Sequence, residues 1–392
     1  MISSNTLEQI LMKSCSSVYV FDIKTLQSRV AWLRSLLPED VSLCFAVKAN
    51  PFLTKEASFL VERLELCSPG EADIFRHLAL PSEKSVISGV YKTPDDIRAL
   101  VREPSFRGII TIESIRQYQI LTRQLETEKK ITPVLLRLTN GSQFGLDETH
   151  IDEIIRHRSL HPYLQIRGIQ FFSGTQKTSL KKYTREIAYL DRFLTHLKED
   201  LRFEAKELEY GPGFPVSYFE EEPSQEELLL QHVSELLNGM KNKSRLVLEL
   251  GRSIAASCGR YYTHIVDLKR NNGQNYALVD GGMHQMVYFG QSMAMKRPRF
   301  SVFGKEGASV DQLWTVCGSL CSMNDVLLKQ TPMPKLEIGD ILCFENTGAY
   351  CMTEGISLFL SRDLPFVYLK REDESLQCIR PSIETQLFNY PH

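Results

Sequence analysis

The 392-residue sequence has no long hydrophobic run and almost no net charge. Nowhere do about 18 apolar residues follow one another, so we expect no membrane-spanning helix. Residues 1–13 lack the basic start and apolar stretch of a secretory signal. The net charge of −2 gives no electrostatic reason to expect a nucleic acid or an anionic membrane as partner. We therefore predict a cytoplasmic protein that binds neither.

Paired cysteines are also missing. The nine cysteines are odd in number and scattered, with no CxxC motif and no histidine spacing typical of zinc sites. This pattern argues against a disulfide framework and against a metal site. We expect reduced thiols, most of them buried as small apolar side chains.

Eight short apolar runs alternate with amphipathic segments between about residues 40 and 255. The runs are 43–47, 64–67, 85–88, 108–112, 133–138, 164–172, 207–210 and 246–250. Helical patterns between them cover 94–102, 115–125, 151–157, 180–199 and 225–240. Eight strand–helix units predict an α/β fold, a closed parallel (β/α)8 barrel whose strands are buried on both faces. An open doubly wound sheet is the alternative, but eight units over this length favour closure.

The pattern changes after about residue 260, where short strands with little helix between them predict a β-domain. These strands are 261–268, 275–279, 313–316, 340–344 and 366–368. One more strand is expected at 17–21 (SVYVF), before the barrel, and we predict that it joins the β-domain. The predicted domains are thus an N-terminal strand segment at 1–25, a barrel at 26–258 and a C-terminal β-domain at 259–392.

Active groups of such a barrel lie at the carboxyl ends of its strands. The first strand ends in Lys48, within CFAVKANP. Burying an ammonium group there is costly unless it is paired or neutralised. Desolvation lowers the pKa of a lysine, which allows it to form an imine with a carbonyl compound. The alternative is a side chain that extends past the barrel rim into water.

The last two strands are followed by glycines. Gly211-Pro212-Gly213 comes after the seventh strand and Gly251-Arg252 after the eighth, where barrels commonly bind phosphate through bare backbone N–H groups. Plain turns are the alternative for either loop. Glu249, one residue before the end of strand eight, needs a cationic partner. A protonated pyridine nitrogen would serve, and so would Arg252 or another barrel residue.

Nine motifs in order resemble one known family, the fold-type III pyridoxal-5′-phosphate (PLP) decarboxylases, which include diaminopimelate, ornithine and arginine decarboxylases. The motifs are CFAVKANP, SPGEADI (68–74), SGVYKT (88–93), QFGLD (143–147), GPGF (211–214), LELGR (248–252), VDGGM (279–283), CSMND (321–325) and TGAY (347–350). The resemblance implies an alanine-racemase-like barrel with PLP at its mouth and a C-terminal β-domain.

The cofactor residues of the family match positions of this chain. By the resemblance, Lys48 is the Schiff-base lysine and Glu249 is the partner of the pyridine nitrogen. The remaining cofactor-binding positions are Phe172, against the ring, and, around the phosphate, Thr175, Gly213, Gly251, Arg252 and Tyr350.

The resemblance also assigns a proton donor. Cys321 matches the cysteine that protonates the substrate carbon after carbon dioxide leaves, a role that a thiol can fill at neutral pH. In this family the cysteine comes from the second subunit, which implies a homodimer with shared active sites. Cys317 has no such match and is interpreted as one more buried cysteine.

The substrate positions depart from the family. Phe172 replaces a histidine, which removes a hydrogen bond but leaves an aromatic face that can stack. Ser322 replaces the acidic residue that grips a distal amino group, and Tyr288 stands where a substrate-binding arginine is usual. Together with Asp325, Ser322 and Tyr288 are our candidates for substrate binding.

These departures favour a biosynthetic decarboxylase of an amino acid or amino-acid conjugate, free or tethered to a carrier protein. In character the chain resembles decarboxylases of specialised metabolism that act on such substrates. A decarboxylase of a free diamino acid such as diaminopimelate and an amino-acid racemase on the same fold are the alternatives. A non-catalytic homologue is a third, which the presence of Lys48, Glu249 and Tyr350 disfavours.

Overall fold

The computed structural model describes residues 7–14, 16–223 and 225–391. The chain forms two compact units. One takes Val30–Pro215 and Gln225–Ile254; the other takes the N-terminal residues to Arg29, the segment that starts at Val216, and the residues from Ala255 on. No helix in the described ranges is both long and apolar enough to cross a membrane.

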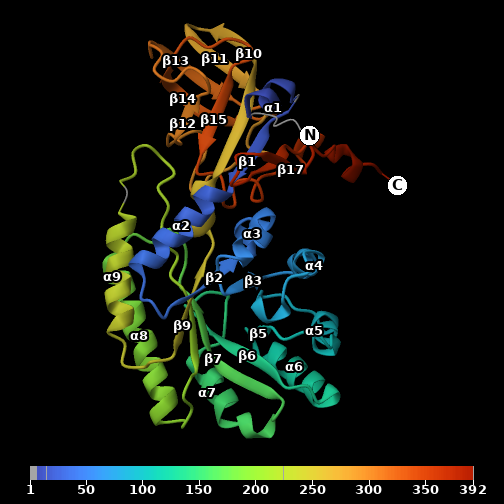
Figure 1. Ribbon diagram of the computed structural model, residues 1–392, viewed down its shortest axis with the longest axis vertical. Coiled ribbons are helices and arrows are strands. Elements are labelled where there is room, and N and C mark those ends of the chain that lie inside the picture. Colours follow the sequence, from blue (N-terminus) through green and yellow to red (C-terminus); the bar gives the residue numbers. More distant parts are fainter. Residues whose placement is uncertain (1–6, 15, 224, 392) are drawn as a thin grey trace. The chain divides into compact units, whose positions relative to one another are not determined.

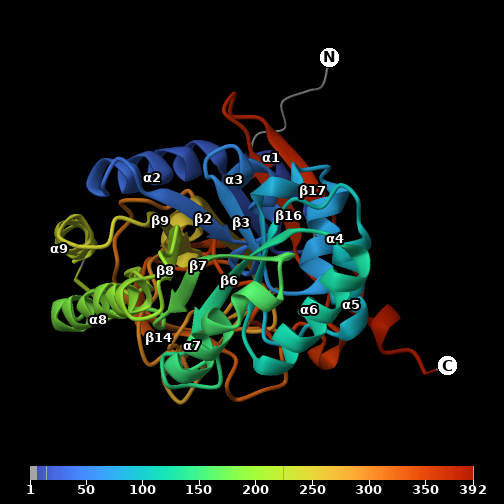
Figure 2. The same ribbon diagram turned by 90° about the horizontal axis from the view of Figure 1, so that it is seen from below.

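The first unit is a closed barrel of parallel strands, as the sequence predicted (Figure 2). In the described residues its strands, in order around the barrel, are β2 (Ser42–Ala46), β3 (Arg63–Leu66), β4 (Ser85–Ile87), β5 (Ile109–Ile112), β6 (Thr132–Leu138), β7 (Leu164–Phe172), β8 (Glu207–Gly211) and β9 (Arg245–Leu250). The last strand pairs with the first, with Glu249 beside Cys44. The apolar runs form strands because both of their faces are buried. One cluster of buried residues takes one residue from each of five strands, β2, β4, β5, β6 and β9: Cys44, Val86, Ile109, Leu135 and Val247.

Helices surround the barrel strands in the end-on view of Figure 2. They are α3 (Thr54–Ser58), α4 (Pro69–His77), α5 (Pro94–Arg102), α6 (Ile115–Glu128), α7 (Glu148–Arg156), α8 (Leu180–Glu199), α9 (Glu226–Asn238) and the short α10 (Arg252–Ala255); α2 (Ile23–Leu36) precedes β2. Several start at a side-chain cap. Ser68 accepts a hydrogen bond from the Glu71 amide, and Thr93 forms a reciprocal capping box with Asp96. Such caps fix where the loop after each strand ends.

The second unit is a mixed sheet (Figure 1). Its main path in the described residues runs β14 (Val326–Met333), β13 (Gln312–Cys317), β11 (Gln274–Val279), β10 (Gly259–Asn271), β1 (Val18–Asp22), β16 (Phe366–Lys370) and β17 (Leu376–Arg380); β15 (Ile341–Glu345) pairs with β10 and with β12 (Phe300–Val302). Strand β1 pairs with β10 and β16, which confirms that the N-terminal strand joins this domain. The helix α1 (Leu7–Lys13) adds Leu11 to a core with Val18, Val20 and Tyr262.

Sequence periodicity missed β12, β14 and β17, whose residues alternate less clearly between buried and exposed positions. The sheet unit also includes the segment that starts at Val216. Its Phe219 forms a bridge with Pro298, and the ring of Tyr218 lies 5.3 Å from that of Tyr288. The loop after β8 is therefore divided between the two units at Pro215.

Candidate active site

Lys48 leaves the first barrel strand in a tight turn. Strand β2 is fully buried, and residues Val47–Ala49 form a single 3₁₀ turn, after which the Asn50 side chain accepts a hydrogen bond from the Phe52 amide. The ammonium nitrogen of Lys48 lies 2.6 Å from Glu65 Oε2, 3.4 Å from Glu249 Oε1 and 3.5 Å from Cys67 Sγ. With 37% of its side chain exposed, Lys48 is reachable from solvent.

The pKa values of the two carboxyl groups beside Lys48 are shifted in opposite directions. Both are buried, and Glu249 donates a hydrogen bond to Glu65. Burial opposes ionisation of Glu65, but the Lys48 ammonium and the hydrogen bond from Glu249 lower its pKa to about 2. Burial and the negative charge of Glu65 raise the pKa of Glu249 well above its usual range. Glu65 is therefore the anion that neutralises Lys48, while Glu249 is a neutral acid that a further cation would ionise.

A second layer of charge lies deeper in the barrel. Arg63 makes two hydrogen bonds to Glu207, at 2.5 and 2.7 Å, and lies 3.4 Å from Glu209. Burial raises the pKa of Glu209 to about 7 against the opposing effect of Arg63. Gln170 on β7 connects this layer to the first, because its amide nitrogen lies 2.9 Å from Glu209 and 3.4 Å from Glu249.

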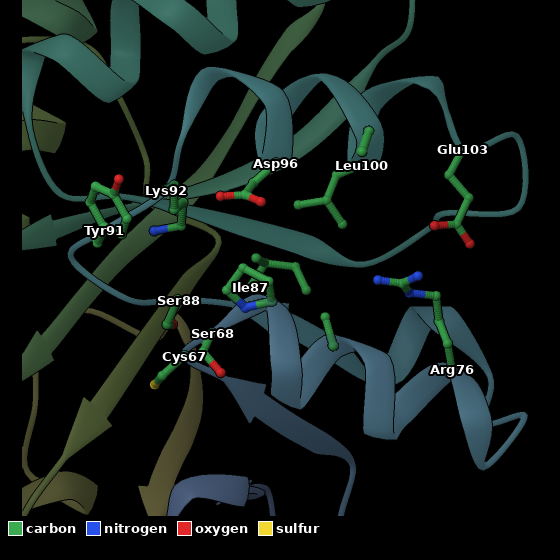
Figure 3. A pocket seen from close by; sticks show the side chains of 13 residues that line it. Cys67, Ser68, Arg76, Ile87, Ser88, Tyr91, Lys92, Asp96, Leu100 and Glu103 are labelled. Atoms are coloured by element: carbon green, nitrogen blue, oxygen red, sulfur yellow. The ribbon is translucent and has the colours of Figure 1, made fainter. Parts of the chain in front are cut away.

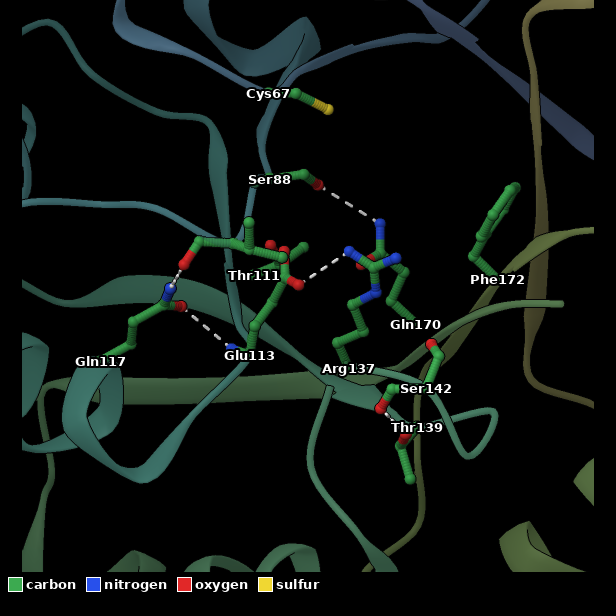
Figure 4. A network of polar contacts seen from close by, with 12 residues as sticks. Cys67, Ser88, Thr111, Glu113, Gln117, Arg137, Thr139, Ser142, Gln170 and Phe172 are labelled. Atoms are coloured by element: carbon green, nitrogen blue, oxygen red, sulfur yellow. Dashed lines mark hydrogen bonds and ion pairs between the residues drawn. The ribbon is translucent and has the colours of Figure 1, made fainter. Parts of the chain in front are cut away.

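An ion pair on the neighbouring strands completes the polar interior (Figure 4). Arg137 Nη1 lies 2.8 Å from Glu113 Oε2, and the Glu113 amide is bonded to the Gln117 side chain at 3.0 Å. Lys92 lies 3.9 Å from Glu113. Burial lowers the pKa of Lys92 to about 8, although Glu113 opposes that shift. The cationic groups of this region are thus each held against a carboxylate.

The loops after β7 and β8 lie in close contact. Gly213 has φ +66°, and a Cβ on it would lie 1.9 Å from the carbonyl oxygen of Gly174, so only glycine fits. The Lys177 amide donates to the Gly213 carbonyl at 3.0 Å, while Thr175 between them is exposed. Gly174 and Gly213 therefore leave backbone groups uncovered by side chains at the place where the sequence predicted a phosphate site.

Two other predicted cofactor residues lie near these loops. Phe172 ends β7 half-buried, and a Cβ on Gly211 would lie 2.6 Å from its ring, so the absence of a side chain at Gly211 leaves room for that ring. Arg252 follows Gly251 directly after β9 and is buried. The barrel unit therefore brings together Lys48, Glu249 and both glycine loops.

The remaining predicted residues belong to the sheet unit. Cys321 is exposed and lines a cavity of about 570 Å³ whose other described lining residues include His284, Ser319 and Arg362. Tyr350 has a φ of +65°, in the left-handed region that a tyrosine rarely adopts. Strain of this kind is often found at functional positions.

Two of the three substrate candidates are engaged within the protein. Asp325 is buried and accepts hydrogen bonds from the amides of Met283 and Leu320, at 2.7 and 2.9 Å. These bonds shape the turn that presents Cys321. Tyr288 is buried with its hydroxyl donating to the Glu345 carbonyl at 2.5 Å. Ser322 is half-buried, and its hydroxyl accepts from the Asn324 amide at 3.2 Å. Substrate contact by these three residues stays a prediction.

The sequence analysis missed Glu65, Gln170 and the Arg63–Glu207–Glu209 cluster. A signal was present, because Arg63 and Glu65, and likewise Glu207 and Glu209, alternate along strands that are otherwise apolar. Charges at a spacing of two residues on a strand point to the same face. In a barrel strand buried on both sides, that face must contain oppositely charged partners.

A separate cavity of about 250 Å³ lies between α4 and α5 (Figure 3). Its walls are mainly apolar, and the described residues that line it include Pro69, Ala72, Ile87, Ala99, Leu100, Cys67, Ser88 and Lys92. Neither Lys48 nor Glu249 is among them. Cys67, which contacts Lys48, and Ser88, which contacts Gln170, line this cavity.

Comparison with known proteins decides the family. The family model described as pyridoxal-dependent decarboxylase, C-terminal sheet domain, matches residues 18–348. The chain belongs to the pyridoxal-dependent decarboxylases.

Relatives of this decarboxylase differ in substrate. It is 27% identical over 388 residues to the 2-[(L-alanin-3-ylcarbamoyl)methyl]-2-hydroxybutanedioate decarboxylase of Staphylococcus aureus, with 91% of this chain and 95% of that protein covered. It is 25% identical over 379 residues to the L-glutamyl-[BtrI acyl-carrier protein] decarboxylase of Niallia circulans, with coverages of 90% and 88%. The crystal structure of Helicobacter pylori diaminopimelate decarboxylase with L-lysine has the same fold, with a TM-score of 0.83 at 20% identity and coverages of 97% and 98%.

The polar interior of the decarboxylase fits its cofactor, PLP. Glu249 is a buried acid that needs a cation to ionise, and the protonated pyridine nitrogen supplies one. The glycine loops leave backbone exposed for a phosphate, because Gly213 has no room for a side chain. Lys48, between Glu65 and Glu249, is the amine available for the aldehyde.

Replacement of Gly213 tests the phosphate loop. Gly213→Ala adds a Cβ that meets the Gly174 carbonyl and fixes an unfavourable positive φ. Strain of about 1–3 kcal/mol should weaken PLP binding by roughly tenfold or more. PLP dissociation constants from absorbance titration measure this. Gly273→Ala is the matched control, because it has φ +79° with nothing within 4 Å and should leave PLP affinity unchanged. Equal affinities for the two variants would contradict a phosphate role for the loop.

Glu209 gives a pH-dependent stability. Its carboxyl pKa rises from 4.5 to about 7 on folding, so the folded state retains a proton that the unfolded state loses. Below about pH 4.5, Glu209 is protonated in both states and does not change the free energy of unfolding. That free energy falls as the pH rises from about 4.5 to about 7, and above about pH 7 the loss is complete. Glu209→Gln should therefore gain up to about 3 kcal/mol at pH 8 relative to its effect at pH 4.5. Urea unfolding at the two pH values measures the difference. The exposed Glu199→Gln variant should show no such dependence.

Proposed function

We propose that this chain decarboxylates an amino acid whose far end is uncharged or joined to a larger group. The observation that carries the catalytic part is the position of Lys48 between the paired acids Glu65 and Glu249. When bound, PLP supplies an electron sink for the electron pair that remains after carbon dioxide leaves.

The barrel residues hold and polarise the cofactor. Lys48 binds its aldehyde carbon, and Glu65, at 2.6 Å, remains as the anion that compensates positive charge at that nitrogen. Glu249 would give its proton to the pyridine nitrogen and would then, as a carboxylate, accept a hydrogen bond from the protonated ring. The face of Phe172 stacks on the ring, while Thr175, Gly213, Gly251 and Arg252 bind the phosphate, joined by Tyr350.

The proton donor comes from the sheet unit. Cys321 is exposed at the edge of its cavity, so its thiol is accessible to a substrate bound on another subunit. We propose a homodimer in which Cys321 of one subunit delivers a proton to the α-carbon of a substrate held at Lys48 of the other. Asp325 supports this role by fixing the turn through the Leu320 amide.

Substrate choice follows from the charges near Cys321. Ser322 carries no charge, and the Asp280 carboxylate that lines the same cavity is already bonded to His264, Thr263 and Ser17. Asp363 lies at the same rim next to Arg362, so the rim carries both signs of charge. These features give little preference for a distal ammonium. The two relatives named above that act on amino acids joined to larger groups support the same choice.

A carbon-dioxide-release screen tests the proposed function. An Nβ-acylated L-2,3-diaminopropionate and an L-glutamyl thioester of pantetheine should be turned over faster than ornithine, lysine or diaminopimelate. A distal ammonium without a carboxylate partner should cost about 3–5 kcal/mol, or roughly two to four orders of magnitude in kcat/KM. Lys48→Ala is the blank. A kcat/KM on the order of 10⁴ M⁻¹s⁻¹ for a free diamino acid would contradict the proposed substrate class and favour an ordinary diamino-acid decarboxylase.

Subunit mixing tests the shared site. Lys48→Ala and Cys321→Ala homodimers should each be inactive, whereas a hybrid contains one site with both residues intact. An equal mixture after exchange should reach about a quarter of wild-type activity, if the sites act independently. Cys378→Ala, another exposed cysteine, is the control and should be active by itself. Inactive mixtures with exchange verified by mass spectrometry would show that Cys321 does not act across subunits.

A further inference from the structure

Gln170 connects two buried acids across the floor of the barrel. Its side chain is 1% exposed, and strand register places Gln170 beside Arg137 on β6 and beside Glu209 on β8. The amide nitrogen lies 2.9 Å from Glu209 Oε1, 3.3 Å from Ser88 Oγ and 3.4 Å from Glu249 Oε2. The bond to Ser88 is drawn in Figure 4. A primary amide has two N–H donors, and the acceptors around this one come from different parts of the barrel: Glu209 on β8, Glu249 on β9 and Ser88 after β4.

The two oxygens of Glu249 therefore have different surroundings. Oε2 faces the amide nitrogen of Gln170, and Oε1 lies 3.4 Å from the nitrogen of Lys48. Each oxygen accepts one N–H bond, Oε2 from Gln170 and Oε1 from Lys48. When Lys48 binds the cofactor aldehyde, Oε1 becomes the oxygen available to the cofactor, whereas Oε2 stays bonded to Gln170.

The far end of the bridge is anchored. Glu209 lies 3.4 Å from Arg63, which in turn makes the two short bonds to Glu207. Gln170 has little freedom to turn away from Glu249, since its closest contact is the 2.9 Å bond to Glu209. The oxygen of its own amide is buried and has no hydrogen-bond partner among the described residues. The Gln170 amide thus keeps this orientation although its oxygen lacks a hydrogen bond, which indicates that the contacts of its nitrogen with Glu209 and Glu249 set the orientation.

We infer that Gln170 is a positioning residue for the cofactor: its amide holds Oε2 of Glu249 against Glu209, so that Oε1 is presented to the pyridine nitrogen of PLP. The hydrogen bond stabilises the ionised form of Glu249 and so favours the protonated ring. Protonation makes the ring a stronger electron sink, which the decarboxylation requires. The inference rests on the role proposed above for Glu249.

The test measures the ring nitrogen directly. PLP labelled with ¹⁵N in the ring is loaded into the full-length enzyme, and its ¹⁵N chemical shift is followed against pH. Gln170→Met keeps the length of the side chain and removes the donor. Loss of a hydrogen bond to a charged group should lower the apparent pKa of the ring nitrogen by about one unit, a tenfold change. Gln170→His restores an N–H donor and should recover part of the shift.

Control variants separate the possible failures. Gln165→Met lies on the same strand but is exposed, and it should leave the ring nitrogen as in the wild type. Glu249→Gln should deprotonate the ring in the working pH range. An unchanged signal in Glu249→Gln would remove the proposed role of Glu249 itself. A changed signal in Glu249→Gln together with an unchanged one in Gln170→Met would overturn the role of Gln170 alone.

A double-mutant cycle tests the bridge to Glu209. Glu209→Leu removes the anchor, so the effect of Gln170→Met on the ring-nitrogen pKa should be smaller in that background than in the wild type. Additive effects would show that Gln170 acts on Glu249 without Glu209. If Gln170→Met does not retain PLP, the ring-nitrogen pKa is measured in Gln170→His instead. A wild-type signal in the histidine variant together with no retention by methionine supports the donor role, whereas an equal loss of PLP in both variants overturns it.

Discussion

The excess of buried carboxylates over buried cations at the centre of the barrel governs the site. Around the Lys48 cluster, Glu65, Glu207, Glu209 and Glu249 face Lys48 and Arg63. Four acids cannot all ionise beside two cations in a low-dielectric interior. Burial and the neighbouring carboxylates accordingly raise the pKa of Glu249 well above its usual range and the pKa of Glu209 to about 7. A cofactor with a basic ring nitrogen provides the missing positive charge.

The barrel unit and the sheet unit contribute different residues to the predicted site, as their architectures allow. A parallel barrel directs the carboxyl ends of all its strands to one mouth, so it can place Lys48, Glu249 and two glycine loops at one site. The mixed sheet carries Cys321 on a turn fixed by Asp325. Cofactor binding and the proton delivery that we propose for Cys321 can thus change separately. This arrangement is consistent with relatives that share the cofactor and differ in substrate.

The residues predicted to bind the substrate also have partners inside the protein. Position matching pointed to Tyr288 and Asp325, yet both make internal hydrogen bonds in the sheet unit. His284 and Arg362, which line the Cys321 cavity, lie in segments that the motifs did not single out for binding. A polar residue at a family position can serve packing as readily as recognition, and only its hydrogen-bond partners separate the two.

The sequence by itself determined the barrel, the strand that joins the sheet domain, and the location of Lys48 and Gly213. These features depend on local patterns: apolar runs, a lysine at a strand end, and a glycine that needs a positive φ. Tertiary structure alone decided which charges meet. Glu65 and Glu249 both reach Lys48 because their strands, β3 and β9, pair with β2 from opposite sides. Glu249 is 201 residues from Lys48 in sequence, and the pairing of the last barrel strand with the first brings the two side chains to 3.4 Å.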